Sequence, residues 1–99
     1  MNHRKVNQIV KQVMAYEPEK VILFGSYASG KSQKYSDVDL VVIKKTKDPF
    51  NLRLKKIRML LKTTTPVDVF VFTPQEFREA LTTNLLVSEI ARSGKVIYG

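Results

Sequence analysis

Two apolar segments joined by a short polar one constrain the fold of this chain most tightly. Val21 to Phe24 is a β-branched and aromatic run that stops at Gly25, which predicts a buried strand leaving a sheet at that glycine. A second run, Leu40 to Ile43, follows Asp37-Val38-Asp39 and predicts another strand. Only the four residues 33–36 separate Ser32 from the strand that Asp37 opens, which leaves no room there for a long helix or a parallel crossover.

The end of the first predicted strand has the residues of a phosphate-binding site. Gly25 would let a ligand come close to the main chain, because it carries no side chain. A helix beginning near Ser26 would present unpaired N–H groups and the positive end of its dipole, and the Ser26 hydroxyl would add a donor. Gly25 and Ser26 are therefore candidate nucleotide-binding residues.

Three carboxylates are the candidate catalytic and metal-binding residues. Asp37 and Asp39 lie two apart, so on a strand they project from one face with Cα atoms about 7 Å apart, which suits a hard cation such as Mg²⁺. Asp68 lies inside the apolar run Val67 to Phe72, where an acid is costly unless it is paired, liganded or at the strand's mouth. We expect it at the mouth. With two Mg²⁺ ions, such carboxylates activate a hydroxyl and neutralise a leaving pyrophosphate, Asp68 acting as base or second-metal ligand.

Together these motifs resemble the DNA polymerase β-type nucleotidyltransferase superfamily. The likeness is carried by Leu23-Phe24-Gly25-Ser26, by Ser36-Asp37-Val38-Asp39-Leu40 and by the Asp68 strand, and it extends over nearly the whole chain. It is greatest to the minimal nucleotidyltransferases, which are similar to the antitoxins of toxins that are all-helical HEPN ribonucleases. The resemblance implies binding of ATP or another NTP with Mg²⁺, and transfer of AMP to a Tyr of a helical HEPN-type partner, or simple masking of that partner.

One position departs from the family pattern. The family usually has Ala-Arg-Gly after Gly-Ser-x, whereas this chain has Ala28-Ser29-Gly30, which removes a positive charge that could order the loop or contact the nucleotide. Two functions therefore stay open: an active nucleotidyltransferase, and a catalytically inactive nucleotidyltransferase fold that neutralises a toxin by binding it.

A rival motif overlaps the first. Gly25 to Ser32 formally satisfies the P-loop pattern of Gly, four residues and Gly-Lys-Ser. A true P-loop begins a long helix at its Lys-Ser, and only four residues separate Ser32 from Asp37. We therefore set this interpretation aside.

Positive charge is concentrated between Lys44 and Lys62, where eight residues are basic and only Asp48 is acidic. A helix there would bury Phe50, Leu54, Ile57 and Leu61, and would turn its basic residues outward, namely Arg53, Lys55, Lys56, Arg58 and Lys62. This face is either a footprint for nucleotide, RNA or an acidic protein, or a solvated surface. Nucleic-acid binding is the weaker alternative, because no aromatic residues are interleaved.

Two lysines and two tyrosines near Gly25 each allow two interpretations. Lys31 and Lys34 either meet phosphates or are solvated. Tyr27 and Tyr35 either stack on a base or anchor the loop.

Local signals predict the remaining elements. Residues 3 to 16 have the apolar spacing of a packing helix. Thr73-Pro74-Gln75-Glu76 is a strong helix start. A helix from Leu85 to Ser93 should end at Gly94 in a left-handed cap, before a strand or tail from Lys95 to Tyr98. The apolar residues Leu85, Leu86, Val87 and Ile90 are expected in the core, with some left for a partner surface.

Length and composition predict one α/β domain spanning residues 1–99, with a small mixed sheet of about four strands and helices mainly on one face. A chain of 99 residues has a modest core, so a partner or a homo-oligomer could add stability. There is no Cys and no long apolar run, which favours a cytoplasmic protein without a membrane span. His3 is the only histidine, so a nucleophilic triad is excluded.

Overall fold

The computed structural model describes residues 4–31 and 37–99. The alternatives raised for Ser32, Lys34 and Tyr35 lie outside the described residues. The elements, in chain order, are α1 (Arg4–Val13), the 3-10 helix η1 (Met14–Tyr16), β1 (Lys20–Phe24), α2 (Ser26–Ser29), β2 (Val38–Ile43), α3 (Phe50–Leu60), β3 (Val67–Phe72), α4 (Pro74–Thr83), α5 (Leu85–Ser93) and β4 (Lys95–Tyr98). In this described part of the chain, no helix is both long and apolar enough to cross a lipid bilayer.

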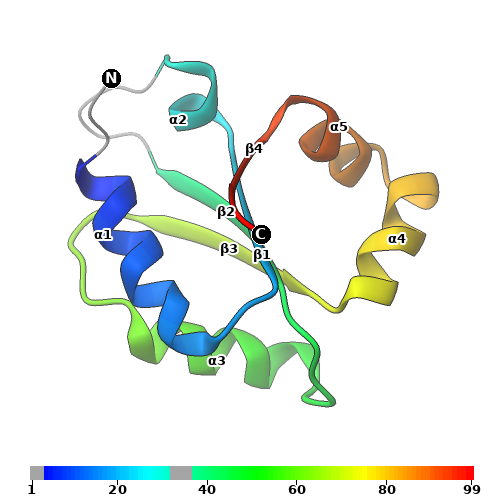
Figure 1. Cartoon of the computed structure of the whole chain (residues 1–99), viewed down its shortest axis with the longest axis horizontal. Helices are drawn as coiled ribbons and strands as arrows, with labels where there is room; N and C mark the ends of the chain where they lie inside the picture. Colours follow the sequence, from blue (N-terminus) through cyan, green and yellow to red (C-terminus); the bar gives the residue numbers. More distant parts are fainter. Residues whose placement is uncertain (1–3, 32–36) are drawn as a thin grey trace.

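The four strands form one mixed sheet in the order β3-β2-β1-β4, which confirms the predicted α/β fold class. β1 is antiparallel to both β2 and β4. β2 and β3 are parallel, and α3 lies in the crossover between them (Figure 1). The antiparallel β1–β2 pair also differs from the strand–helix–parallel strand arrangement of a P-loop.

Alternating strand residues build a core on each face of the sheet. On one face Leu23, Leu40 and Val69 pack with Ile9 of α1 and Ile57 of α3. On the other face is a smaller cluster, in which strand residues Ile22, Val41 and Ile43 pack with Ile90 of α5 and Phe77 of α4. Figure 1 shows α1 and α3 on one side of the sheet and α4 and α5 on the other. The larger core lies under α1, α2 and α3, and a prediction of helices mainly on one face understates the cover that α4 and α5 provide.

The start of α4 is the predicted one. The Thr73 hydroxyl accepts a hydrogen bond of 3.2 Å from the Glu76 N–H, and the Glu76 carboxylate accepts one of 2.8 Å from the Thr73 N–H. This capping box satisfies N–H groups that the first helical turn leaves without partners. α5 follows at once, and its start is capped by the Asn84 side chain, which accepts from the N–H groups of Leu86 and Val87.

Gly94 corrects one prediction. Its φ of −74° and ψ of 166° are extended, so it is not a left-handed cap. A Cβ at this position would lie 2.5 Å from the Ile90 carbonyl oxygen and 2.8 Å from the Ile22 side chain. The glycine is needed because α5 turns into β4 directly against β1.

The outward face of α5 corrects the prediction that its apolar residues lie mainly in the core. Val87 and Ile90 are buried, but Leu85 is 90% exposed and Leu86 is 53% exposed. The core therefore takes only half of the apolar residues that the sequence offers here.

The face that α3 buries differs from the predicted one. Arg53, expected outward, is only 7% exposed, and Phe50, expected inward, is 49% exposed. The reason is a set of hydrogen bonds: the Arg53 guanidinium donates to both Glu76 carboxylate oxygens at 2.6 and 3.2 Å, and to the Asp48 and Val71 carbonyls at 2.8 and 3.3 Å. A buried charge with this many partners is well satisfied. Arg53 thus ties α3 to the end of β3 and the start of α4.

Candidate functional site

Asp39 and Asp68 lie side by side at the beginning of the two parallel strands. They are register partners in the β2–β3 ladder, and each is the second residue of its strand. Their neighbours Leu40 and Val69 belong to the larger core, so the two aspartates project from the opposite face, beyond the last apolar residues of the smaller cluster. Asp68 is exposed, as expected at the mouth of a strand.

Gly25 lies against this pair. β1 runs antiparallel to β2 and places Phe24 opposite Asp39, so the chain leaves the sheet next to the carboxylate. Gly25 has a φ of 74°, and a Cβ built on it would lie 2.2 Å from the Asp39 Oδ2 atom. Only a glycine lets the main chain pass this close to Asp39.

Ser26 begins α2, which is a single turn. The N–H groups of Ala28 and Ser29 both donate to the Gly25 carbonyl at 3.1 Å, and the Ser26 carbonyl accepts from the Lys31 N–H at 2.9 Å. These bonds hold the loop that follows β1 in one shape. Gly25 and Ser26 thus lie where a phosphate would meet the carboxylates, and their role as ligands stays a prediction.

The charges of Asp68 and Asp37 act on Asp39. The pKa of Asp39 is raised, first by burial, then by the charges of Asp68 and Asp37, and also by a hydrogen bond with the Asp68 side chain. Asp37 is exposed, precedes β2, and acts on Asp39 through its charge. Among residues 4–31 and 37–99, none of the three forms an ion pair with a Lys or Arg.

This donor set fits a hard divalent cation in part. Within the described residues no group of three acidic or histidine side chains is gathered closely enough to form a complete metal site. Asp39 and Asp68 are brought together, whereas Asp37 is not drawn in with them. Two adjacent carboxylates that repel each other and have no basic partner among the described residues are what a cation would stabilise. Mg²⁺ needs only one or two protein carboxylates when phosphates and water complete its octahedron.

A cavity opens directly beside Gly25, between α2 and α5. Its volume is about 270 Å³, just below the range of about 300–1,000 Å³ common for ligand pockets. The lining residues are Phe24, Gly25, Ala28, Ser29, Leu86, Glu89, Ile90 and Ser93. Sequence reasoning did not find Glu89 and Ser93, because no local signal shows that α5 packs beside α2. Ser29, which replaces the usual Arg of the family pattern, is one wall of this cavity.

The other residues singled out near the loop have simpler places. Tyr27 is buried at 7% exposure within the larger core, so it anchors the loop and does not lie open to a base. Lys31 is exposed.

Comparisons with known proteins agree on the family and on the fold. A family model described as polymerase beta, nucleotidyltransferase, matches residues 5–99. A crystal structure of a candidate nucleotidyltransferase from Sulfolobus solfataricus is similar, with a TM-score of 0.59 and 24% identity over 75% of this chain and 68% of that chain. At that identity the likeness concerns the fold. No curated protein gives a significant match.

Proposed function

Because the chain belongs to the polymerase β nucleotidyltransferase family, we propose that it transfers a nucleoside monophosphate from an NTP, AMP from ATP in the simplest case, to a hydroxyl group of a protein partner. The observation that carries this proposal is the Asp39–Asp68 pair, held in register across β2 and β3 and packed against Gly25. A glycine lets a triphosphate approach the main chain closely, and carboxylates beside it could hold the Mg²⁺ that bridges to the phosphates.

The proposed reaction moves the nucleoside monophosphate from one oxygen to another. The acceptor oxygen forms a bond to the α-phosphorus, the bond from that phosphorus to the bridging oxygen breaks, and pyrophosphate leaves with that oxygen. The acceptor's proton passes to the Asp68 carboxylate, which is exposed at the strand's mouth. Gly25 and Ser26 bind the phosphates. Mg²⁺ held by Asp37, Asp39 and Asp68, as one or two ions, would neutralise charge on the triphosphate and the leaving group.

The test is transfer of label from ATP labelled at the α-phosphate, with Mg²⁺ and a cytoplasmic lysate or candidate partner. We expect labelled protein with the wild-type chain and a loss of at least about a hundredfold with Asp39→Asn, since charge stabilisation of this kind contributes two to three orders of magnitude. Asp48→Asn is the matched control, because Asp48 lies in the segment between β2 and α3, away from Asp39, and pairs with Lys56. Undiminished labelling by Asp39→Asn would contradict the proposal.

A second candidate function is non-catalytic binding of a helical partner of the HEPN type. It is favoured by the exposure of Leu85 and Leu86 at the start of α5, where Leu86 also lines the cavity at Gly25. Exposed apolar side chains beside a site are typical of partner surfaces. Ser29 in place of the usual Arg fits a fold that binds without transferring.

The two functions separate in one experiment. A binding module keeps neutralising its partner after Asp39→Asn, and loses the partner after Leu85→Asp with Leu86→Asp. Met59→Asp is the control for placing an acidic residue at an exposed apolar position elsewhere, because Met59 is 70% exposed on α3. Neutralisation that fails with Asp39→Asn while the partner still binds would exclude the non-catalytic role.

A further inference from the structure

A second concave surface lies at the other end of the sheet. The segment that follows β2 and the first turns of α4 enclose a cavity of about 540 Å³. It is lined by Lys45, Thr46, Lys47, Thr73, Pro74, Gln75 and Arg78, with no acidic residue among them. Asp39 and Asp68 are at the opposite ends of β2 and β3, about 17 Å away for strands of six residues at about 3.3 Å each. The cavity is therefore separate from the candidate catalytic site.

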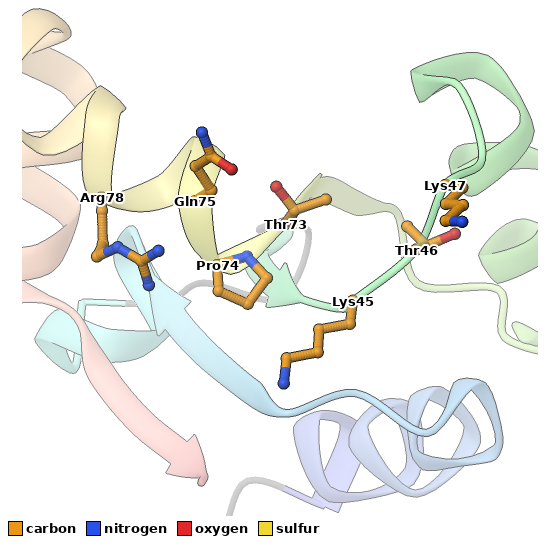
Figure 2. A pocket seen from close by; sticks show the side chains of 7 residues that line it. All are labelled: Lys45, Thr46, Lys47, Thr73, Pro74, Gln75 and Arg78. Atoms are coloured by element: carbon orange, nitrogen blue, oxygen red, sulfur yellow. The ribbon is translucent and has the colours of Figure 1, made fainter.

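Its basic side chains are available to a ligand. Figure 2 shows the charged ends of Lys45 and Arg78 on the same side as the Pro74 ring, with Lys47 at the far end and the Gln75 amide turned away. Lys45 is 80% exposed and reaches Glu19 at 3.5 Å, a surface contact worth little. Neither Lys47 nor Arg78 forms an ion pair with any other residue that the structure describes.

The cavity shares lining residues with two neighbouring hollows. One, of about 340 Å³, shares Pro74 and Arg78 with it and adds Lys20. The other, of about 500 Å³, shares Thr46 and adds Lys44 and Lys56. We call this row of hollows the basic strip; its charged lining residues are Lys20, Lys44, Lys45, Lys47, Lys56 and Arg78, against Glu19 and Asp48. Charges in a row, without convergence on one point, match a chain of phosphates better than a single anion.

Helix α3 is a poorer anion surface than its sequence indicates. Arg53 is buried against Glu76, and Lys56 donates to Asp48 at 2.7 Å. Lys55 and Arg58 are exposed on α3, but they line none of the hollows of the basic strip. The concave positive surface is thus the strip, to which α3 adds only Lys56, whose charge is partly offset by Asp48.

We propose that the basic strip binds the phosphodiester backbone of a single-stranded nucleic acid, independently of nucleotidyl transfer. Lysines and an arginine along a groove neutralise successive phosphates, and a single strand can bend to follow the hollows. The strip offers few groups that could read base edges, so binding depends little on base sequence.

The test measures binding of a fluorescently labelled 12-nucleotide single-stranded RNA, and of DNA with the same sequence, by anisotropy at several salt concentrations. Lys45→Glu with Arg78→Glu should weaken binding at least about tenfold and reduce the salt slope by about 0.7 per lost phosphate contact. Lys55→Glu with Arg58→Glu on α3 makes the same change in net charge and exchanges the same residue types, so it is the matched control. We expect it to weaken binding less than threefold.

Three results would overturn the proposal: no binding by the wild-type chain, equal weakening by the two double variants, or greater weakening by the α3 pair. Weaker binding of DNA than of RNA would identify the ligand as RNA. Equal affinities for the two would mean that the strip binds any single-stranded nucleic acid. Thermal melts of each variant check folding, and Lys45→Gln with Arg78→Gln repeats the comparison without charge reversal. Labelling from ATP is unaffected by the strip variants, so failure of this inference is distinguishable from failure of the proposed transfer.

Discussion

Gly25 shows how a missing side chain can determine the shape of a site. Its positive φ carries the chain away from β1, and the space that a Cβ would fill is occupied by the Asp39 carboxylate. The sequence alone predicted that a ligand needs Gly25 for close approach. The structure adds that the catalytic candidate itself needs it.

Gly25→Ala should disturb the site more than its backbone conformation alone explains. Gly30→Ala is a partial control, because Gly30 shares the positive φ (77°) and has nothing within 4 Å of its added Cβ. Its ψ of 12° is left-handed helical, whereas the ψ of −153° at Gly25 belongs to a conformation that is essentially restricted to glycine. We expect Gly30→Ala to lose about 1–2 kcal/mol from an L-residue in the left-handed region. Gly25→Ala should lose more, about 1–3 kcal/mol from its glycine-only backbone conformation and about 1–3 kcal/mol from overpacking against Asp39. Chemical denaturation of both proteins measures the difference. Equal losses would show that Asp39 can move aside freely.

Asp39 should also set a pH dependence of stability. Because the pKa of Asp39 is raised in the folded chain, the folded state keeps this proton to higher pH than the unfolded state. Between the unfolded pKa of about 3.9 and the raised value, stability therefore falls as pH rises. Asp39→Asn cannot ionise, so without metal it should melt a few degrees above the wild type at pH 7 and show no such gain at pH 3.

Asp48→Asn is expected to change in the opposite direction. A hydrogen bond with Lys56 lowers the pKa of Asp48, so removing its charge should destabilise the folded chain at pH 7. Thermal melts of both variants at the two pH values test the pair. A melting temperature of Asp39→Asn below that of the wild type at pH 7 would contradict the view that burial and the charges of Asp68 and Asp37 destabilise the ionised Asp39 carboxylate.

At the scale of elements, the structure shows what local signals can predict. The capping box at Thr73 and the bounds Leu85–Ser93 depend on neighbouring residues, and the structure confirms both. The buried position of Arg53 depends on Glu76, 23 residues later, which periodicity cannot reveal. Gly94 was assigned the commonest role of a glycine after a helix, whereas its actual role comes from Ile22 in β1.

Arg53→Met should destabilise the fold by about 2 kcal/mol. It keeps most of the side-chain volume but leaves the Asp48 and Val71 carbonyls and the Glu76 carboxylate without charged donors. Lys56→Met, on the same helix, removes only an exposed pair with Asp48 and should change stability much less. Urea denaturation compares the two. Similar losses would mean that the Arg53 cluster adds nothing beyond a surface contact.

On the scale of the whole molecule, the fold class and the placement of Asp39, Asp68 and Gly25 at one end of the strands were predictable. The strand patterns, the loop lengths and the spacing of the aspartates restrict the topology. Cavities were not. The pocket at Gly25 needs α5 beside α2, and the basic strip joins the end of β2 to α4, pairs of elements separated by crossovers. Their lining residues become neighbours only once the chain is folded.

Mg²⁺ should stabilise the whole fold through the carboxylates. A ligand that binds only the folded state at ten times its dissociation constant adds about 1.4 kcal/mol. We expect the melting temperature of the wild type to rise with Mg²⁺ and to return with EDTA, and that of Asp39→Asn with Asp68→Asn to stay unchanged. Asp48→Asn is again the control. An equal rise in all three proteins would place the cation elsewhere.

The pairing of Asp39 with Asp68 couples mutational tolerance to activity. In a parallel ladder the side chains alternate between faces, so deletion of one residue ahead of Asp68 would turn that carboxylate into the core and expel Val69 and Val71 from it. A one-residue register shift of β3 would thus disrupt the core packing and the candidate site together. Insertions and deletions, in evolution or in engineering, should therefore be confined to loops, such as the one joining α3 to β3, where they leave the register of the β2–β3 ladder unchanged.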